Sequence, residues 1–459
     1  MARIDRRHFL RNTGLALAGL AGLPRALRAE LDRKLRITEI EAHNVAPPLH
    51  DFNAEELFRY HGYSVLERVV FIVKTAGGLE GYGESGIGYD PERFKKYLDT
   101  SPFDWIAEEE NLPINMAIYD LMGKYLGVPS WKLIGSQSRS WVPIAAWTVS
   151  RSPEAMAEEV VNNARRGYRW LKYHVDVLQN AVDQTEAMQK VAPKGFKVHY
   201  DFNEDSNLEA VYPVLRELER FPIAGRIEDP IRNEDQDGYR LLRQKVRIPI
   251  LIHHGPHDVF VRESLCDGFM MGHSSVGRAI KGAGVAEAYN FPFMMQNAGM
   301  GINLAFLAHQ AAVFRMATLE HVTLDNLWKD DVLVKRNPVV GGSVAVPTGP
   351  GLGIQVDRAK LDTYKSTPRR KQKRFIVRVR YDGGPNLYFR FDPDVPGANV
   401  RFLNKPGFGR RHSGFGPDVP GPKPGYGNPV ISDFWDDVGD KKFEEMWKRT
   451  ESGPVWTYR

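Results

Sequence analysis

The feature that most restricts the fold is a regular alternation of short apolar strands and amphipathic helices that begins at Trp141. Strand starts recur about every 25 to 30 residues, which is typical of parallel βα units. The strand-like runs are WVPIAAW (141–147), YRWLKYH (168–174), KVHYDFN (197–203), GRIEDP (225–230), IPILIHH (248–254), DGFMMG (267–272) and FPFMMQN (291–297). Seven or eight such units predict an α/β chain with a (β/α)8 barrel, whose chemistry is expected at the C-terminal ends of the strands.

A different pattern precedes the barrel region. Residues 35–45, 66–75 and 77–84 have the composition of strands, and residues 114–127 show helical spacing that ends at Gly127 and Pro129. The sequence therefore predicts strands and a helix in front of the barrel, without the regular strand–helix alternation.

The first 29 residues have the layout of a twin-arginine export signal. Arg6 and Arg7 precede a small, apolar run from Thr13 to Leu23, and Ala29 is a small residue after which cleavage could follow. The run is too short to span a bilayer as a helix. We expect export by the twin-arginine route and a periplasmic or extracytoplasmic location. The alternative is an amphipathic first helix of the fold.

Charge and cysteine content narrow the choice of partners. The formal net charge is +5, and residues 1–29 alone contain six arginines and one acidic residue, so the rest of the chain is neutral. A neutral body argues against nucleic acid as the partner, because phosphate binding requires a basic surface. Cys266 is the only cysteine. Any metal must therefore be bound by oxygen and nitrogen ligands.

Polar residues stand where four successive predicted strands end. Lys172 and His174 share one face of their strand, and the following strands end with Asp201, Glu228 and the pair His253–His254. A single carboxylate at a strand end is usually a helix cap or turn residue. Four in succession are harder to explain in this way, because a charged group in a barrel mouth must be paired or bound to a metal.

Three stretches resemble the enolase superfamily, in the mandelate racemase and muconate lactonizing enzyme group. They are AIYDLMGKYLGVPSWKLIG (117–135), the ordered series KYH, DFN and IEDP along the strands, and VVGGSVAVPTGPGLGIQVD (339–357). The resemblance implies a modified barrel with an N-terminal α+β capping domain and a C-terminal segment that returns to that domain. The tail after this segment lies outside the family pattern. We divide the chain into residues 1–29, 30–140, 141–330, 331–365 and 366–459.

The resemblance also implies the chemistry. A base removes the proton α to a substrate carboxylate, and a divalent metal, normally Mg²⁺, stabilises the resulting charge. By position, Asp201 and Glu228 match two of the metal ligands and Asn203 matches the asparagine that accompanies the first. Lys172 matches the first lysine of the family's Lys-x-Lys. The implied partner is a small-molecule carboxylate, and a homo-oligomer is the expected assembly.

The sequence departs from the family at several positions. The third ligand position falls on His254, with His253 as the alternative, and this favours Mn²⁺, Fe²⁺ or Zn²⁺ at least as much as Mg²⁺. His174 replaces the second lysine; it is either a general base or a hydrogen-bonded structural histidine. Gln296 or Asn297 stands at the position of the histidine that serves the racemases. Asn203, His253, Gln296 and Asn297 are expected beside the substrate or behind the ligands.

Loss of that histidine disfavours a two-base racemase of the familiar kind. The leading hypothesis is a metal-dependent, dehydratase-like lyase for a sugar acid, with Lys172 or His174 as base. The first alternative is an exported carbohydrate-binding protein with a degenerate site. The second is an epimerase in which His174 works with another group such as His273, although strand alternation would turn His273 to the wrong face.

The tail contains a predicted hairpin at residues 375–391 and a glycine-proline-rich stretch at residues 383–429. The aromatic segment that follows contains Phe434, Trp435, Trp447 and Trp456, which is too aromatic for a disordered linker. We expect it to pack on the core or on a neighbouring subunit, near the loop from Pro47 to Tyr63.

Overall fold

The computed structural model describes residues 33–61, 64–86, 90–176, 179–204, 207–365, 367–381, 384–394 and 430–458. The predicted export signal and most of the glycine-proline-rich stretch lie outside these residues. None of the described helices is both long enough and apolar enough to cross a membrane.

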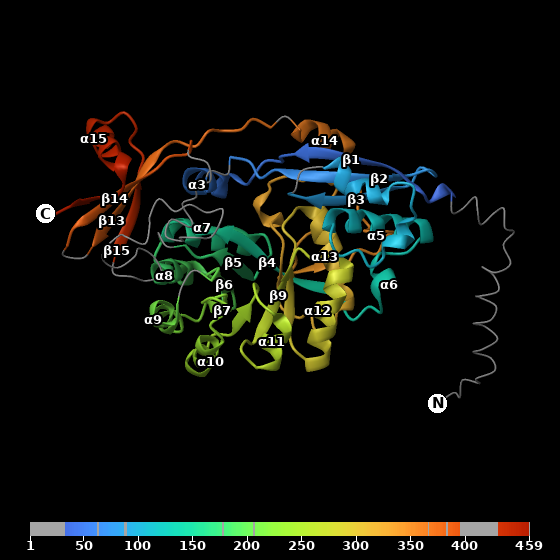
Figure 1. The fold of residues 1–459 in the computed structure, drawn as a ribbon, viewed down its shortest axis with the longest axis horizontal. Helices are drawn as coiled ribbons and strands as arrows, with labels where there is room; N and C mark the ends of the chain where they lie inside the picture. The colour runs from blue at the N-terminus through green and yellow to red at the C-terminus, as the bar shows by residue number, and fades with distance from the viewer. Residues whose placement is uncertain are drawn as a thin grey trace.

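The N-terminal unit is an antiparallel sheet of three strands covered by a helix, as predicted (Figure 1). Glycines in the third strand allow the helix backbone to lie directly against the sheet: a Cβ atom at Gly81 would stand 2.1 Å from the carbonyl oxygen of Ala117, and one at Gly83 only 1.8 Å from that of Pro113. The elements are β1 (Ile37–Val45), α3 (Asp51–His61), β2 (Arg68–Thr75), β3 (Glu80–Ser85), α4 (Pro91–Phe94) and α5 (Leu112–Leu126).

Eight parallel strands close into the predicted barrel, because the last strand pairs with the first. The strands are β4 (Trp141–Val149), β5 (Trp170–His174), β6 (Lys197–Asp201), β7 (Ala224–Glu228), β8 (Ile250–Ile252), β9 (Gly268–Gly272), β10 (Phe293–Gln296) and β11 (His321–Val322). The helices between them are α7 (Pro153–Arg165), α8 (Ala181–Val191), α9 (Leu208–Leu218), α10 (Gln236–Lys245), α11 (His257–Arg262), α12 (Val276–Tyr289) and α13 (Gly301–Val313).

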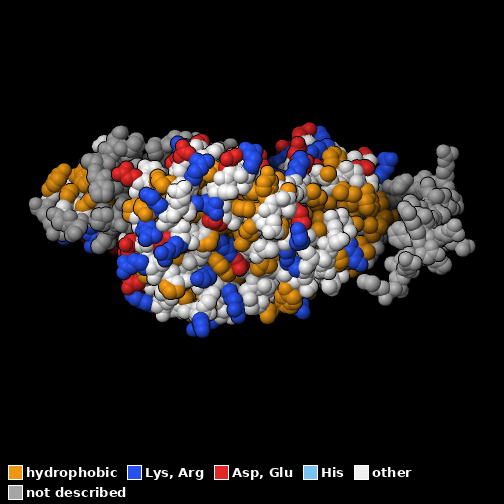
Figure 2. Space-filling view, turned by 90° about the horizontal axis from the view of Figure 1, so that it is seen from below, with side chains coloured by type: hydrophobic (Ala, Val, Ile, Leu, Met, Phe, Trp, Pro, Cys, Tyr) orange, Lys and Arg blue, Asp and Glu red, His pale blue; other side chains and the backbone are white. Residues whose placement is uncertain are grey.

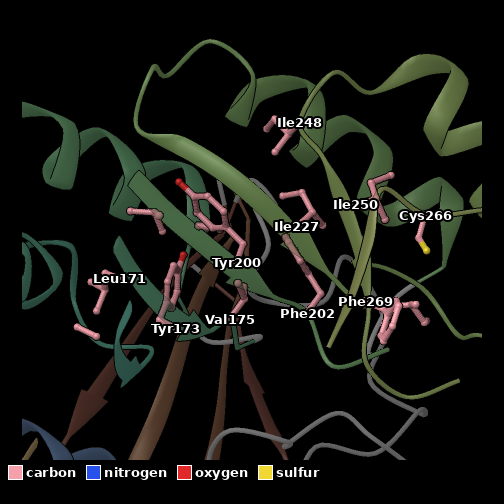
Figure 3. Packing of buried hydrophobic residues seen from close by; sticks show 14 of the residues in the cluster. Leu171, Tyr173, Val175, Tyr200, Phe202, Ile227, Ile248, Ile250, Cys266 and Phe269 are labelled. Atoms are coloured by element: carbon pink, nitrogen blue, oxygen red, sulfur yellow. The ribbon is translucent and has the colours of Figure 1, made fainter. Parts of the chain in front are cut away.

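Alternation along the strands separates two layers of core. Side chains on the outer face, such as Tyr173, Tyr200 and Ile227, pack between the strands and their helices (Figure 3). Side chains on the inner face, such as Trp147 and Met270, belong to the same cluster as the capping sheet. The capping domain and the barrel interior therefore share one apolar core.

The segment after the barrel returns to the capping domain, in which Arg358 pairs with Glu41 and Glu80. Its elements are β12 (Ser343–Ala345), which is antiparallel to β4, and α14 (Arg358–Tyr364). Basic and acidic side chains are interspersed on the face of the molecule shown in Figure 2.

The C-terminal extension forms a small four-stranded sheet with one helix at one end of the molecule (Figure 1). Its elements are β13 (Phe375–Tyr381), β14 (Asn386–Phe391), β15 (Val430–Trp435), α15 (Lys441–Arg449) and β16 (Val455–Thr457). The predicted hairpin is β13–β14. The extension contacts α3, a helix that forms where the sequence predicted a loop at residues 47–63. There Arg59 pairs with Asp436, beside Trp435 of the aromatic segment, so the expected packing near these residues is confirmed.

Candidate active site and metal centre

Three neighbouring barrel strands deliver the polar side chains that the sequence places at strand ends. In the parallel register His174 of β5 stands opposite Asp201 of β6, and Asp201 stands opposite Glu228 of β7. Lys172 and His174 both contact the Asp201 carboxylate. The prediction that these two side chains share the inner face of β5 is therefore confirmed.

Lys172 is fully buried and surrounded by acceptors. Its Nζ lies 2.8 Å from Glu228 Oε1, 3.1 Å from Asp201 Oδ2 and 3.0 Å from Gln296 Oε1. Burial lowers the pKa of this amine, but the two carboxylates outweigh burial and raise it above its ordinary value. Lys172 is thus a cation at neutral pH, which makes it a charge partner rather than a proton acceptor.

His174 stands nearer to the barrel mouth and keeps 13% of its side chain exposed. Its Nε2 lies 3.1 Å from Asp201 Oδ2 and 3.4 Å from the indole Nε1 of Trp147. The two rings meet edge to face, with 4.9 Å between their centroids. The carboxylate and the indole fix the orientation of the ring. A positioned imidazole that reaches the mouth is suited to move a proton.

The carboxylates of Asp201 and Glu228 remain ionised despite burial. Burial and the charge of Glu228 raise the pKa of Asp201, but Lys172 and His174 hold it below its usual range. Burial also raises the pKa of Glu228, and Lys172, His199 and His253 together hold it well below its usual range. Two ionised carboxylates so close together require a cation between or beside them.

Asp229 completes a carboxylate cluster that the sequence did not indicate. One oxygen each of Asp201, Glu228 and Asp229 lie within 4.8 Å of one another, and all three residues are buried. Asp229 follows β7 with a φ of 45°, a left-handed conformation that ends the strand. Because strand alternation no longer applies, its carboxylate lies on the same side as that of Glu228.

The predicted third ligand, His254, is not one of the three clustered carboxylate residues. Its Nδ1 lies 2.6 Å from Asp229 Oδ2, and a second potential metal group within the described residues consists of Asp229, His253 and His254. The hydrogen bond to Asp229 raises the pKa of His254. His254 therefore touches the carboxylate cluster through Asp229, whereas His253 Nδ1 lies 3.3 Å from Glu228 Oε1.

This donor set fits a divalent metal. Three clustered carboxylates are the hard oxygen ligands that Mg²⁺ and Mn²⁺ prefer, and two adjacent imidazoles add donors that suit Mn²⁺, Fe²⁺ or Zn²⁺. Asp201, Glu228 and Asp229 would hold the ion.

The remaining predicted residues support the site in different ways. The backbone N–H of Asn203 donates to Asp201 Oδ1 at 2.9 Å, and its side-chain amide donates to the Asp201 carbonyl oxygen. Gln296 accepts from Lys172, as described above. Asn297 is buried and accepts from the backbone N–H of Ser274 at 3.2 Å, so it orders the turn after β9.

Sequence reasoning missed His199, whose Nε2 lies 2.7 Å from Glu228 Oε2 inside the barrel. The signal was present, because His199 precedes Asp201 by two residues and so shares its face. The expected direction of His273 was wrong. This residue follows the end of β9 with a φ of 47° and lines a cavity between barrel and capping domain.

Comparison with known proteins agrees with this geometry. The model of a family described as enolase C-terminal domain-like matches residues 155–360. The barrel belongs to the enolase superfamily. The D-gluconate dehydratase of Thermoproteus tenax is 24% identical over 377 residues, which cover 70% of this chain and 73% of that protein. The N-succinyl-L-Arg/Lys racemase of Bacillus cereus is 24% identical over 251 residues, 48% of this chain and 66% of that protein.

Solved structures share the superfamily fold. A mandelate racemase/muconate lactonizing family protein from Azoarcus sp. EbN1 superposes with a TM-score of 0.60 at 21% identity, covering 73% of this chain and 99% of that protein. The capping domain and barrel are thus common to both proteins, and the likeness extends to about three quarters of the present chain.

Proposed function

We propose that this enolase-superfamily enzyme is a metal-dependent dehydratase, which abstracts the proton α to the carboxylate of a sugar acid and eliminates water. The D-gluconate dehydratase relative supports this substrate class. The observation that carries the proposal is that His174 and Lys172 reach the carboxylate centre from the same strand.

The side chains across the barrel from β5 favour a mechanism with a single base. There β10 ends in Gln296, followed by Asn297, and amides do not accept protons at neutral pH. Lys172 is held as a cation by Asp201 and Glu228. Among these residues, His174 is therefore the group suited to act as base.

In this proposal His174 takes the α-proton, and the C–H electron pair moves towards the substrate carboxylate. Lys172 stabilises the negative charge that develops there. A metal bound by the carboxylates would supply further Lewis-acid stabilisation of that charge. The protonated His174 can return its proton to the β-hydroxyl, which leaves as water, and the enol product rearranges to a 2-oxo acid.

The test is turnover of a panel of aldonic acids by the full chain with Mg²⁺ or Mn²⁺, followed by detection of 2-oxo acids. His174→Gln is expected to lower kcat by about 10²- to 10⁴-fold, because it removes a general base, and to weaken metal binding no more than about tenfold, as for a partner of the ligand Asp201. Glu228→Gln is expected to abolish metal retention and turnover together. His43→Gln, in β1 and outside the site, is the matched control. A fully active, metal-free Glu228→Gln enzyme would exclude the proposal.

An epimerase is the second candidate, because His273 lines the cavity beside the barrel mouth and the B. cereus relative is a racemase. Reaction in D₂O separates the two. An epimerase incorporates deuterium at the α-carbon without loss of water, a dehydratase forms the 2-oxo acid, and a carbohydrate-binding protein does neither.

A further inference from the structure

A cavity of about 390 Å³ lies where the capping sheet meets the barrel mouth. Its walls come from both domains. Arg68 and Glu84 belong to the capping sheet, Arg93 belongs to α4, and His273 and Arg278 belong to the segment that follows β9. A molecule in this cavity would therefore touch residues of both domains.

The cavity has a positive charge that the protein itself does not balance. Arg68 is paired with Glu84, at 2.8 Å between Nε and Oε1, and Glu110 at the rim pairs with Lys96 at 2.8 Å. Within the described part of the chain, no carboxylate lies within 4 Å of the Arg93 or Arg278 guanidinium. Lys96 and, to a smaller extent, Arg93 lower the pKa of Glu110, which lines the same cavity. Because Glu110 is paired with Lys96, the exposed Arg93 and Arg278 side chains leave a positive charge that an anionic ligand would balance.

Arg68 is also held rigidly. Its Nη2 donates to the carbonyl oxygen of Ala298 at 2.5 Å, and Glu84 is fixed in turn by the backbone N–H of Met300 at 2.8 Å. The arginine therefore joins the capping sheet to the segment after β10 and gives the cavity a preformed wall.

The cavity adjoins the proposed reaction centre. Ala298 follows Gln296, the amide that accepts from Lys172, by two residues. On the other side His253 bridges the two regions: its Nδ1 lies 3.3 Å from Glu228, and its Nε2 would stand 2.4 Å from a Cβ atom at Gly272, next to His273. A substrate bound at the carboxylate centre could thus extend into the cavity.

We infer that this cavity, through Arg93 and Arg278, binds a second anionic group at the far end of the substrate. This rests on the proposed function and narrows it: the substrate is an acid with a second carboxylate or with a phosphate, rather than a simple aldonic acid. Arg68 with Glu84 positions the wall, and the two free guanidinium groups provide the charge-assisted hydrogen bonds.

The test compares three acids with one six-carbon frame that differ at C6: D-gluconate, with a hydroxymethyl group, D-glucarate, with a carboxylate, and 6-phospho-D-gluconate. Binding to the metal-loaded wild-type protein is measured by calorimetry and turnover by formation of the 2-oxo acid. We expect at least one of the two-anion acids to bind about tenfold or more tightly than D-gluconate, the usual worth of one charged hydrogen bond. Which of the two binds better identifies the terminal group.

Arg278→Gln and Arg93→Gln are expected to remove most of this preference while affinity for D-gluconate changes less than about twofold. Lys281→Gln is the matched control, since it removes a positive charge from the same helix α12 at a residue that pairs with Glu109 outside the cavity. Equal affinity of the wild-type protein for all three acids, or equal loss for all three in Arg278→Gln, would overturn the inference. Tighter binding of a two-anion acid without turnover would support the anion subsite and contradict the dehydratase proposal. Turnover with equal affinity for all three acids would support the dehydratase proposal and contradict the subsite.

Discussion

At the scale of single residues, the site is organised by how buried charges compensate one another. Lys172 contacts both Asp201 and Glu228. His199 of β6 contacts Glu228 Oε2, and His253, which follows β8, contacts Glu228 Oε1. Removing one partner from such a group leaves a buried charge unpaired, which is costly. Burial raises the pKa of the third carboxylate, Asp229, and a bound metal would add the positive charge that favours its ionised form.

The identity of the third metal ligand gives the first prediction. Asp229 shares the cluster with Asp201 and Glu228, whereas His254 contacts Asp229. We expect Asp229→Asn to weaken Mn²⁺ binding by about 100-fold or more and His254→Gln by about tenfold, as for a ligand and its supporting partner. Calorimetric titration of the purified variants with Mn²⁺ measures both. The reverse order would establish His254 as the ligand, as the resemblance in the sequence implied.

Sequence reasoning found most of the site residues that obey strand alternation, although it missed His199, and it did not anticipate Asp229 or the direction of His273. Lys172, His174, Asp201 and Glu228 lie within strands, so their faces follow from spacing. Asp229 and His273 adopt positive φ, which few non-glycine residues do and which no local sequence pattern announced. Their side chains reach the site through a backbone conformation that only the folded structure specifies.

At the scale of elements, the C-terminal extension acts on α3. Arg370 donates two hydrogen bonds to Glu55, at 2.8 and 3.1 Å, and its guanidinium lies 3.8 Å from the centre of the Phe58 ring. Arg59 Nε lies 3.3 Å from Asp436, and Gln372 donates to the Arg59 carbonyl oxygen. Helix α3 lies between this extension and α7, in the segment that connects the first two strands of the capping sheet (Figure 1).

These contacts predict that the extension holds α3 in place. Replacement of Arg370 by alanine together with Asp436→Asn removes two partly exposed ion pairs, each of modest strength. We expect amide exchange in residues 51–61 to accelerate about fivefold, because local opening becomes easier there. Mass spectrometry of deuterated peptides measures this. Arg380→Ala is the control, since Arg380 pairs with Asp433 inside the extension; similar acceleration in that variant would contradict the prediction.

Elements were predictable where they are apolar and recur at a regular spacing. The barrel strands up to β10 and the hairpin β13–β14 were identified from their composition, but β11 is only His321–Val322 and has no sequence signal of its own. It is recognised as a strand because it pairs with both β10 and β4 and so closes the barrel. Closure is a property of the whole sheet, which local propensity does not encode.

At the scale of the whole molecule, buried histidines connect stability to pH. His321 accepts a hydrogen bond from the backbone N–H of Met295 at 2.9 Å, and His309 accepts one from that of Trp131 at 3.3 Å. Burial lowers the pKa of His321 to about 3 and that of His309 to about 4. Both imidazoles are therefore neutral acceptors in the folded protein, whereas in the unfolded chain they titrate near their ordinary value of about 6.5.

Below pH 6.5 the unfolded chain takes up protons at these positions and the folded protein does not, so the free energy of unfolding falls as pH falls. Each histidine contributes a slope of up to about 1.4 kcal/mol per pH unit. Asp331, whose pKa burial raises to about 7, contributes with the opposite sign, because the folded protein binds its proton first as pH falls. The histidine contribution is therefore isolated by comparing slopes between variants.

The variants His321→Asn and His309→Asn test this pH dependence of stability. Each keeps a hydrogen-bond acceptor near the position of Nδ1 but cannot be protonated. Urea unfolding at a series of pH values gives the free energy for each protein. Between pH 5.5 and 4.5, each variant should lose stability less steeply than the wild-type protein, by about 1 kcal/mol per pH unit, and the double variant by about twice that amount. Asp331 is present in all of them, so its contribution cancels in the comparison. Parallel curves for variant and wild type would mean that the two imidazoles gain protons in the folded state, and hence that the protein interior admits charge at these positions.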